Sequence, residues 1–155
     1  MSLTMKHLRN ILIAVDESEN AKRAVLYVRD LLTGLEGFHI SIITIIPEPS
    51  EDYFASDDEK SLWIEQTQAK AQKVLEGFRQ LFIQGKFREE NVATHIVFKE
   101  CISIGECILD EQKKRSCGTV VIGRRGISKK EEFIFGSTSN KILHSAKDCS
   151  IWVIE

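Results

Sequence analysis

The sequence has few of the features that mark membrane, secreted or nucleic-acid-binding proteins. Its longest apolar stretches, such as residues 42–46, are far too short to cross a bilayer, and its first residues lack the apolar core of a signal peptide. Lys and Arg number 21 against 23 Asp and Glu, so no global field draws nucleic acid or a membrane surface to the protein. We therefore expect a cytoplasmic protein that binds neither.

Cysteine and histidine are too scattered to indicate a metal site. The four cysteines show no CxxC spacing, so reduced thiols are expected in a cytoplasmic protein. Cys101 and Cys107 could meet across a strand-to-helix turn, but their interpretation as small buried apolar residues is favoured. The histidines have no ligand spacing to one another or to cysteine, so no zinc site is predicted. The remaining residues of these two types are Cys117, Cys149, His7, His39, His95 and His144.

Apolar runs typical of buried strands alternate with segments of helical periodicity. The runs cover residues 11–15, 40–46, 120–122 and 151–154, and residues 92–98 alternate enough to predict a further strand. After the first run, Ser18 is well placed as a helix N-cap, and alanine, valine and leucine recur behind it at helical spacing. The second run is expected to end at Pro47, because proline cannot continue a central strand. Residues 48–58 are polar and acidic, which predicts a surface loop.

Strands that are separated by helices must pair in parallel, because tight hairpins between them are excluded. The sequence therefore predicts an α/β fold with an open five-stranded parallel sheet and helices on both faces. With no linker and no internal repeat, residues 1–155 are expected to form one domain, in which residues 1–7 are an irregular leader.

Two polar segments follow strands, at the edge where open parallel sheets bind ligands. Asp16 follows the first strand. Gly123-Arg124-Arg125-Gly126 follows the fourth, and after nine more residues comes Gly136-Ser137-Thr138-Ser139. Gly123 and Gly126 can take positive φ and let the backbone approach a phosphate chain. The second motif opens the last helix, whose free N–H groups favour an anion. The alternative is two tight turns and a helix cap with no ligand.

The spacing G-x2-G-x9-G-[ST], followed by a helix and a terminal apolar strand, resembles the nucleotide-binding signature of the universal stress protein family. The opening residues 11–18 and the ending residues 149–154 resemble that family too, although proline is more usual after Cys149. The resemblance implies a Rossmann-like sheet of order 3-2-1-4-5 with the nucleotide between the first and fourth strands. Because the glycines are kept, it implies the ATP-binding branch.

The resemblance also implies roles for individual residues. Ala14, Val15 and Asp16 would wall the adenosine, with the Asp16 carboxylate near the ribose, and Ile45 would meet the adenine through its backbone. The residues expected to hold the ribose and phosphates are Gly123, Gly126, Gly136, Ser137, Thr138 and Ser139.

Three features at the predicted site have more than one interpretation. Ile102-Ser103-Ile104 stands where the family often has Gly-x-Pro, which alters a turn near the pocket rim. Arg124 and Arg125 either clamp distal phosphates or form a solvated basic turn. For Asp16, ribose contact or helix capping is favoured over Mg²⁺ ligation, because a lone carboxylate is a thin metal site.

These features favour a regulatory or sensor module in stress response that binds ATP, or AMP in its place, with Mg²⁺ accompanying the nucleotide. An apolar edge strand bounded by Ile151 and Ile154 predicts a homodimer, and an unidentified regulatory protein is the expected partner. One alternative is a slow ATPase, although no general base and no other catalytic residue is predicted. The other is a dimerisation module without nucleotide.

Overall fold

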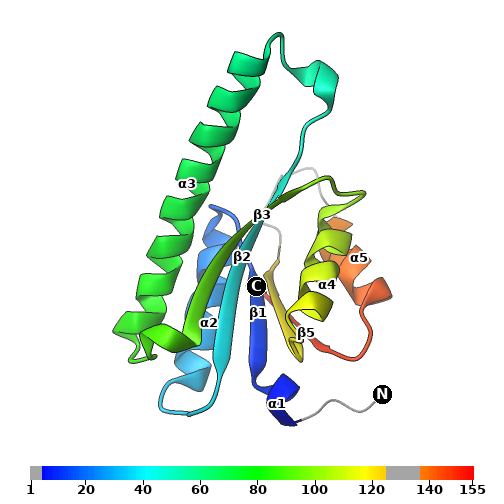
Figure 1. Ribbon diagram of the computed structural model, residues 1–155. Coiled ribbons are helices and arrows are strands. Elements are labelled where there is room, and N and C mark those ends of the chain that lie inside the picture. The colour runs from blue at the N-terminus through cyan, green and yellow to red at the C-terminus, as the bar shows by residue number, and fades with distance from the viewer. Residues whose placement is uncertain (1–4, 125–136) are drawn as a thin grey trace.

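The computed structural model describes residues 5–124 and 137–155, and their strands and helices alternate along the chain (Figure 1). The strands are β1 (Asn10–Ala14), β2 (His39–Pro47), β3 (Val92–Lys99), β4 (Thr119–Gly123) and β5 (Ser150–Ile154). The helices are α1 (Met5–Leu8), α2 (Glu19–Leu32), α3 (Asp57–Gln84), α4 (Ile104–Lys114) and α5 (Ser137–Ser145). Short 3-10 turns, η1 (Glu51–Tyr53) and η2 (Glu89–Asn91), precede α3 and β3.

The five strands form one parallel sheet in the order β3-β2-β1-β4-β5, which confirms the predicted fold class and strand order. β1 is central, with Ile13 paired to Ile42 of β2 on one side and to Val121 of β4 on the other. The chain runs outward from β1 to β3 and then returns to the opposite side of β1. The strand order therefore reverses between β1 and β4, where parallel sheets open a crevice for ligands.

Helices cover both faces of the sheet: α2 and α3 lie on one face, and α4 and α5 on the other (Figure 1). The side chains of β1 alternate between the two cores. Ile11 and Ile13 pack in the cluster under α2 and α3, whereas Leu12 packs in the cluster under α4 and α5. All three are at most 1% exposed. Burial on both faces explains why β1 is a continuous apolar run rather than an alternating one.

β2 ends at Pro47, as expected, and the proline pairs with Lys99 of β3. Two other expectations about segment ends were wrong. The acidic segment after β2 contains η1, and α3 begins at Asp57. Residues 5–8 form the helical turn α1, where an irregular leader was expected. The turn is held by the His7 carbonyl, which accepts the N–H of Gly118 at 2.9 Å.

No helix in the described part of the chain combines the length and the apolarity that crossing a membrane requires. The long helix α3 contacts the sheet only through its C-terminal part, where Leu75, Phe78 and Phe82 are buried. Its N-terminal part projects beyond the sheet (Figure 1).

Candidate functional site

A cavity of about 540 Å³ opens at the carboxyl ends of β1 and β4, the point where the strand order reverses. Its size lies in the range of small-molecule and cofactor sites. It is lined by Ala14, Val15, Asp16, Ser18, Asn20, Ala21, Thr44, Ile45, Ser103, Ile104, Gly105, Ile108, Ile122, Gly123, Arg124, Thr138 and Ser139. The cavity gathers residues that are as many as 125 positions apart in the sequence into one wall.

The loop after β1 is held by its own polar side chains. The Val15 N–H donates to the Ile43 carbonyl at 2.8 Å, which extends the β1–β2 pairing by one residue. One oxygen of Asp16 accepts the N–H of Ser18 at 2.8 Å, and the Ser18 hydroxyl accepts the N–H of Ala21 at 3.2 Å. Ser18 is thus the N-cap of α2, as predicted. Asp16 is exposed in the cavity wall, and among the described residues only its first carboxylate oxygen accepts a hydrogen bond.

Gly123 serves close packing rather than the positive φ that was expected. Its φ does not lie in the left-handed region, unlike that of Gly34 and Gly37. A Cβ at Gly123 would stand 2.6 Å from the carbonyl oxygen of Asn20 and 2.7 Å from its carbonyl carbon. The glycine therefore lets the end of β4 lie against the first turn of α2. The cavity wall gains its shape from this approach of two backbones.

Replacing Gly123 with alanine should lower the free energy of unfolding by about 1–3 kcal/mol, because the new methyl group meets backbone atoms that cannot rotate away. Chemical denaturation measures the change. Gly77 in α3 provides the control, since a Cβ there has no atom within 4 Å. Gly77→Ala should stabilise the protein by about 0.5–1 kcal/mol through helix propensity. If Gly123→Ala has the same free energy of unfolding as the wild type, β4 and α2 can move apart at no cost.

Arg124 lines the cavity but has a partner outside it. The Arg124 guanidinium forms an ion pair with Glu155 at 2.7 Å. The backbone N–H of Arg124 donates to the Ile154 carbonyl. The side chain is 38% exposed and that of Glu155 is 82% exposed, so the pair is screened by water and weakly held. The predicted phosphate clamp would require Arg124 to exchange Glu155 for a ligand.

The first turn of α5 forms another part of the cavity wall. Thr138 and Ser139 line the cavity there, and Ser139 is only 3% exposed. Ser137 is the first residue of the helix. Arg125, Gly126 and Gly136, which the sequence also proposed, lie outside the described residues.

Nine cavity residues were not proposed as site residues from the sequence, and three of these are consecutive. Ser103, the N-cap of α4, lines the cavity together with Ile104 and Gly105 of the first helical turn. Gly105 is buried, and a Cβ there would stand 3.0 Å from the side chain of Lys141, so the glycine lets α4 pack closely on α5. The departure from the family pattern at residues 102–104 was the available signal. The other six are Ser18, Asn20, Ala21, Thr44, Ile108 and Ile122.

The cysteines depart from the expectation of four reduced thiols. Cys101 and Cys107 form a disulfide, with their Cα atoms 6.0 Å apart. The start of α4 turns the chain back on itself, which brings the two side chains within bonding distance despite a separation of six residues. Cys117 and Cys149 are free, and burial raises the pKa of Cys117 to about 11. No group of three or more His, Cys, Asp or Glu residues in the described ranges is placed to hold a metal ion.

Fold and cavity define a class of protein: an open parallel α/β sheet with a ligand-sized site at its switch point. The sequence matches the Universal stress protein family over residues 7–155, and the chain belongs to that family. This confirms the family indicated by the Gly-rich spacing. No curated protein matches the sequence significantly.

Solved structures of the same family show the same fold. Universal stress protein UspA from Lactobacillus plantarum is 19% identical over 98% of this chain and 100% of its own, with a TM-score of 0.73. A universal stress protein from Archaeoglobus fulgidus in complex with dAMP is 16% identical over 96% and 99%, with a TM-score of 0.66. A further solved structure, of a universal stress protein in complex with cAMP, is 15% identical over 96% of this chain and 98% of its own, with a TM-score of 0.67.

Proposed function

We propose that this protein binds an adenine nucleotide in the cavity between β1 and β4 and acts as a regulatory module in stress response. The observation that carries the proposal is the mixed lining of the cavity, in which apolar side chains occur together with hydroxyl, carboxylate, amide and guanidinium groups. A nucleotide offers both kinds of surface, because its base is apolar and its phosphates are charged.

The apolar part of the lining fits a planar base. It comprises Ala14, Val15 and Ile45 at or near the strand ends, together with Ile104 and Ile108 of α4. The backbone of Ile45, near the end of β2, supplies polar groups for the edge of the base. We assign the ribose to Asp16, whose second carboxylate oxygen can accept from a ribose hydroxyl.

The polar residues of the lining fit phosphate groups. Thr138 and Ser139 lie in the first turn of α5, where unpaired N–H groups and the helix dipole attract an anion. Gly123 lets the end of β4 lie against the first turn of α2, whose Asn20 also lines the cavity. Arg124 adds a positive charge that can leave its exposed partner Glu155. The relatives solved with dAMP and cAMP support an adenine nucleotide as the ligand.

ATP is the nucleotide we favour, with AMP as the alternative. Asp16 is the only carboxylate in the described cavity wall, so the protein offers few ligands for Mg²⁺. The phosphate oxygens and water would supply most of the ligands of the ion. The metal would then arrive with the nucleotide rather than occupy a site built by the chain.

The proposal is tested by purifying the protein without added nucleotide, denaturing it and analysing the released small molecules by mass spectrometry. We expect ATP or AMP close to one per chain. A chain purified empty should bind ATP with Mg²⁺, or AMP, with a dissociation constant around the micromolar range, as a few charge-assisted hydrogen bonds allow. An empty chain that binds neither would leave a dimerisation module without nucleotide as the function.

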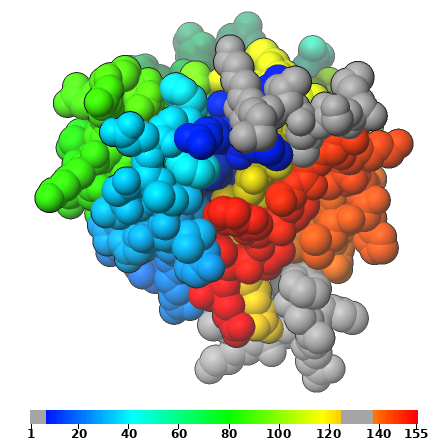
Figure 2. All heavy atoms as spheres, turned by 90° about the horizontal axis from the view of Figure 1, so that it is seen from below, coloured from blue at the N-terminus to red at the C-terminus, as the bar shows by residue number. Residues whose placement is uncertain are grey.

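We also propose that β5 pairs with its copy in a second chain. β5 is an edge of the sheet, and the C-terminal segment (red) lies open at the surface in Figure 2. The four residues from Ile151 to Ile154 are all apolar and only half-buried. An apolar, unpaired edge is a ready surface for another strand. Pairing about a two-fold axis would place the two copies of β5 antiparallel and close the assembly as a dimer.

A further inference from the structure

The segment that joins β3 to α4 is thinly supported, although it forms part of the cavity wall. Residues 101–103 have no regular secondary structure, and Ile102 is 95% exposed. Ile104, the first residue of α4, is 42% exposed and lines the cavity together with Ser103 and Gly105. Packing of apolar side chains therefore does little to fix this rim.

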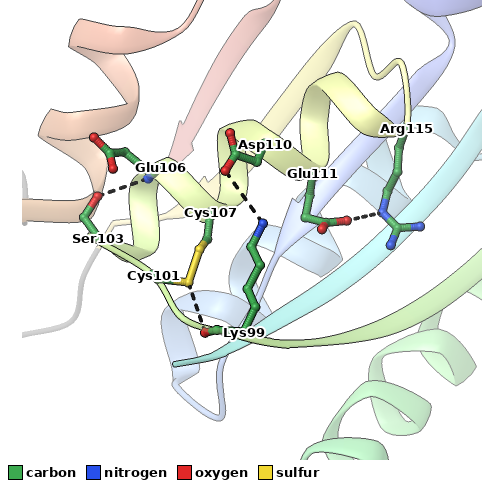
Figure 3. A network of polar contacts seen from close by, with 8 residues as sticks. All are labelled: Lys99, Cys101, Ser103, Glu106, Cys107, Asp110, Glu111 and Arg115. Carbon is green, nitrogen blue, oxygen red and sulfur yellow. Dashed lines mark hydrogen bonds and ion pairs between the residues drawn. A yellow bond between two sulfur atoms is a disulfide. The ribbon is translucent and has the colours of Figure 1, made fainter. Parts of the chain in front are cut away.

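A covalent bond fixes it instead. The disulfide between Cys101 and Cys107 spans Ser103, Ile104 and Gly105 and joins the loop to the first turns of α4 (Figure 3). Inside this ring, the Ser103 hydroxyl accepts the N–H of Glu106 and its carbonyl accepts the N–H of Cys107, both at 3.2 Å.

The remaining ties between the end of β3 and α4 are weak. The ammonium group of Lys99 lies 3.7 Å from the Asp110 carboxylate, and both side chains are more than a third exposed (Figure 3). The Cys101 sulfur lies 3.6 Å from the Lys99 carbonyl, but as part of a disulfide it has no proton to donate. The start of α4 is held on its other side by α5, where Gly105 packs on Lys141 and Glu106 forms an ion pair with Lys141 at 2.9 Å. Breaking the disulfide would thus free residues 101–103 from their covalent tie to α4.

We propose that Cys101 and Cys107 form a redox-active site that exchanges with low-molecular-weight thiols, and that the oxidised state holds the cavity rim in its binding conformation. The proposal rests on the nucleotide-binding function proposed above. The disulfide is then a reversible modification site whose state sets the affinity of the cavity for its nucleotide.

The exchange proceeds in two balanced steps. The thiolate of a small thiol attacks the sulfur of Cys101, which is half-buried, whereas Cys107 is only 3% exposed. A bond forms between the small thiol and Cys101 while the Cys101–Cys107 bond breaks, and its electron pair goes to the Cys107 sulfur, which takes up a proton. A second small thiol attacks the mixed disulfide and releases Cys101 as a thiol. Two external thiols become one disulfide, and the protein gains two thiols.

The position of Cys107 favours the first step. It lies in the early turns of α4, where the helix N-terminus stabilises the departing thiolate. The free cysteines do not compete as readily. Cys117 is buried, and burial raises its pKa to about 11, so it stays protonated. Burial and the nearby Asp148 also raise the pKa of Cys149.

Reduction should weaken binding of AMP by about tenfold, since ordering roughly one residue of the freed rim again costs that much affinity. Calorimetric titration with AMP measures both states of the full chain. Counting free thiols identifies them: two in the oxidised protein, Cys117 and Cys149, and four after treatment with dithiothreitol. Reoxidation should restore the original dissociation constant.

Two variants separate this role from simple stabilisation. Cys101→Ser should bind AMP as weakly as the reduced protein, with or without dithiothreitol. Cys149→Ser, which removes a thiol outside the rim, should keep the full difference between oxidised and reduced protein. A disulfide that only stabilises the fold would lower the melting temperature on reduction and leave the dissociation constant unchanged.

Equal dissociation constants for oxidised and reduced wild-type chain would overturn the proposal, and this comparison needs no substitution that could impair folding. An oxidised chain that binds no adenine nucleotide would instead refute the function proposed for the cavity. The two failures are therefore distinct.

Discussion

Replacing Thr138 with glutamate should weaken binding of ATP or AMP by at least about a hundredfold, equivalent to about 2.7 kcal/mol. Thr138 lines the cavity in the first turn of α5, where we place the phosphates. A carboxylate there would repel them and would occupy the N–H groups that they need. The fold should survive, because an acidic residue in the first turn of a helix is favourable. Titration calorimetry measures the loss, and circular dichroism checks the fold.

Asn140→Glu is the matched control for this variant. Asn140 lies two residues further along the same helix, is exposed and is not part of the described cavity wall. The substitution introduces the same charge, but outside the cavity wall. We therefore expect the dissociation constant of this variant for AMP or ATP to stay within about threefold of the wild type. Equal losses in both variants would point to a general effect of charge. If Thr138→Glu binds nucleotide with the wild-type dissociation constant, the phosphates do not lie at the first turn of α5.

The architecture was predictable because two patterns agree. Apolar runs such as residues 11–15 are buried on both faces, and each is followed by a segment of helical periodicity, which leaves a parallel sheet as the only simple arrangement. The strand order is a different matter. Nothing in the periodicity says that β4 returns to the side of β1, and that order was implied by the family resemblance alone.

The candidate site was predictable where residues directly follow the central strands. Asp16 after β1 and Arg124 after β4 meet at one cavity because the carboxyl ends of neighbouring parallel strands share an edge. Thr138 joins them through the glycine-rich spacing. Ser103 was expected in a turn near the pocket rim but was not proposed as a cavity residue, since it follows β3, a strand that does not pair with β1 or β4. Ser103 reaches the cavity because the fold places the start of α4 beside α5.

The sequence was least informative about glycine and cysteine. Gly123 lies in a turn motif that indicates positive φ, whereas its role is set by the Asn20 carbonyl of a different element. The Cys101–Cys107 pair shows the same limit, because its spacing fits either a disulfide or two buried thiols. The choice depends on how closely α4 folds back on the end of β3.

Replacing Val153 with proline should dissociate the proposed dimer while each chain remains folded. The Ser150 N–H donates to Gly118, and the Ile154 carbonyl accepts from Arg124, so residues 150, 152 and 154 direct their backbone groups toward β4. Alternation along the strand leaves the N–H groups of Ile151 and Val153 directed outward. Proline at 153 therefore removes no bond to β4, which is the condition under which an edge strand tolerates it.

In a symmetric dimer each substitution acts twice. Two intermolecular hydrogen bonds would be lost at about 0.5–1.5 kcal/mol each, and two proline rings would crowd the partner strand. We expect the dissociation constant of the dimer to rise at least about a hundredfold, measured by sedimentation equilibrium. Val153→Thr, which keeps the N–H group and the branched shape, should remain a dimer. If Val153→Pro associates as tightly as the wild type, the chains do not join through β5, and the half-buried apolar residues of that edge must have another cover.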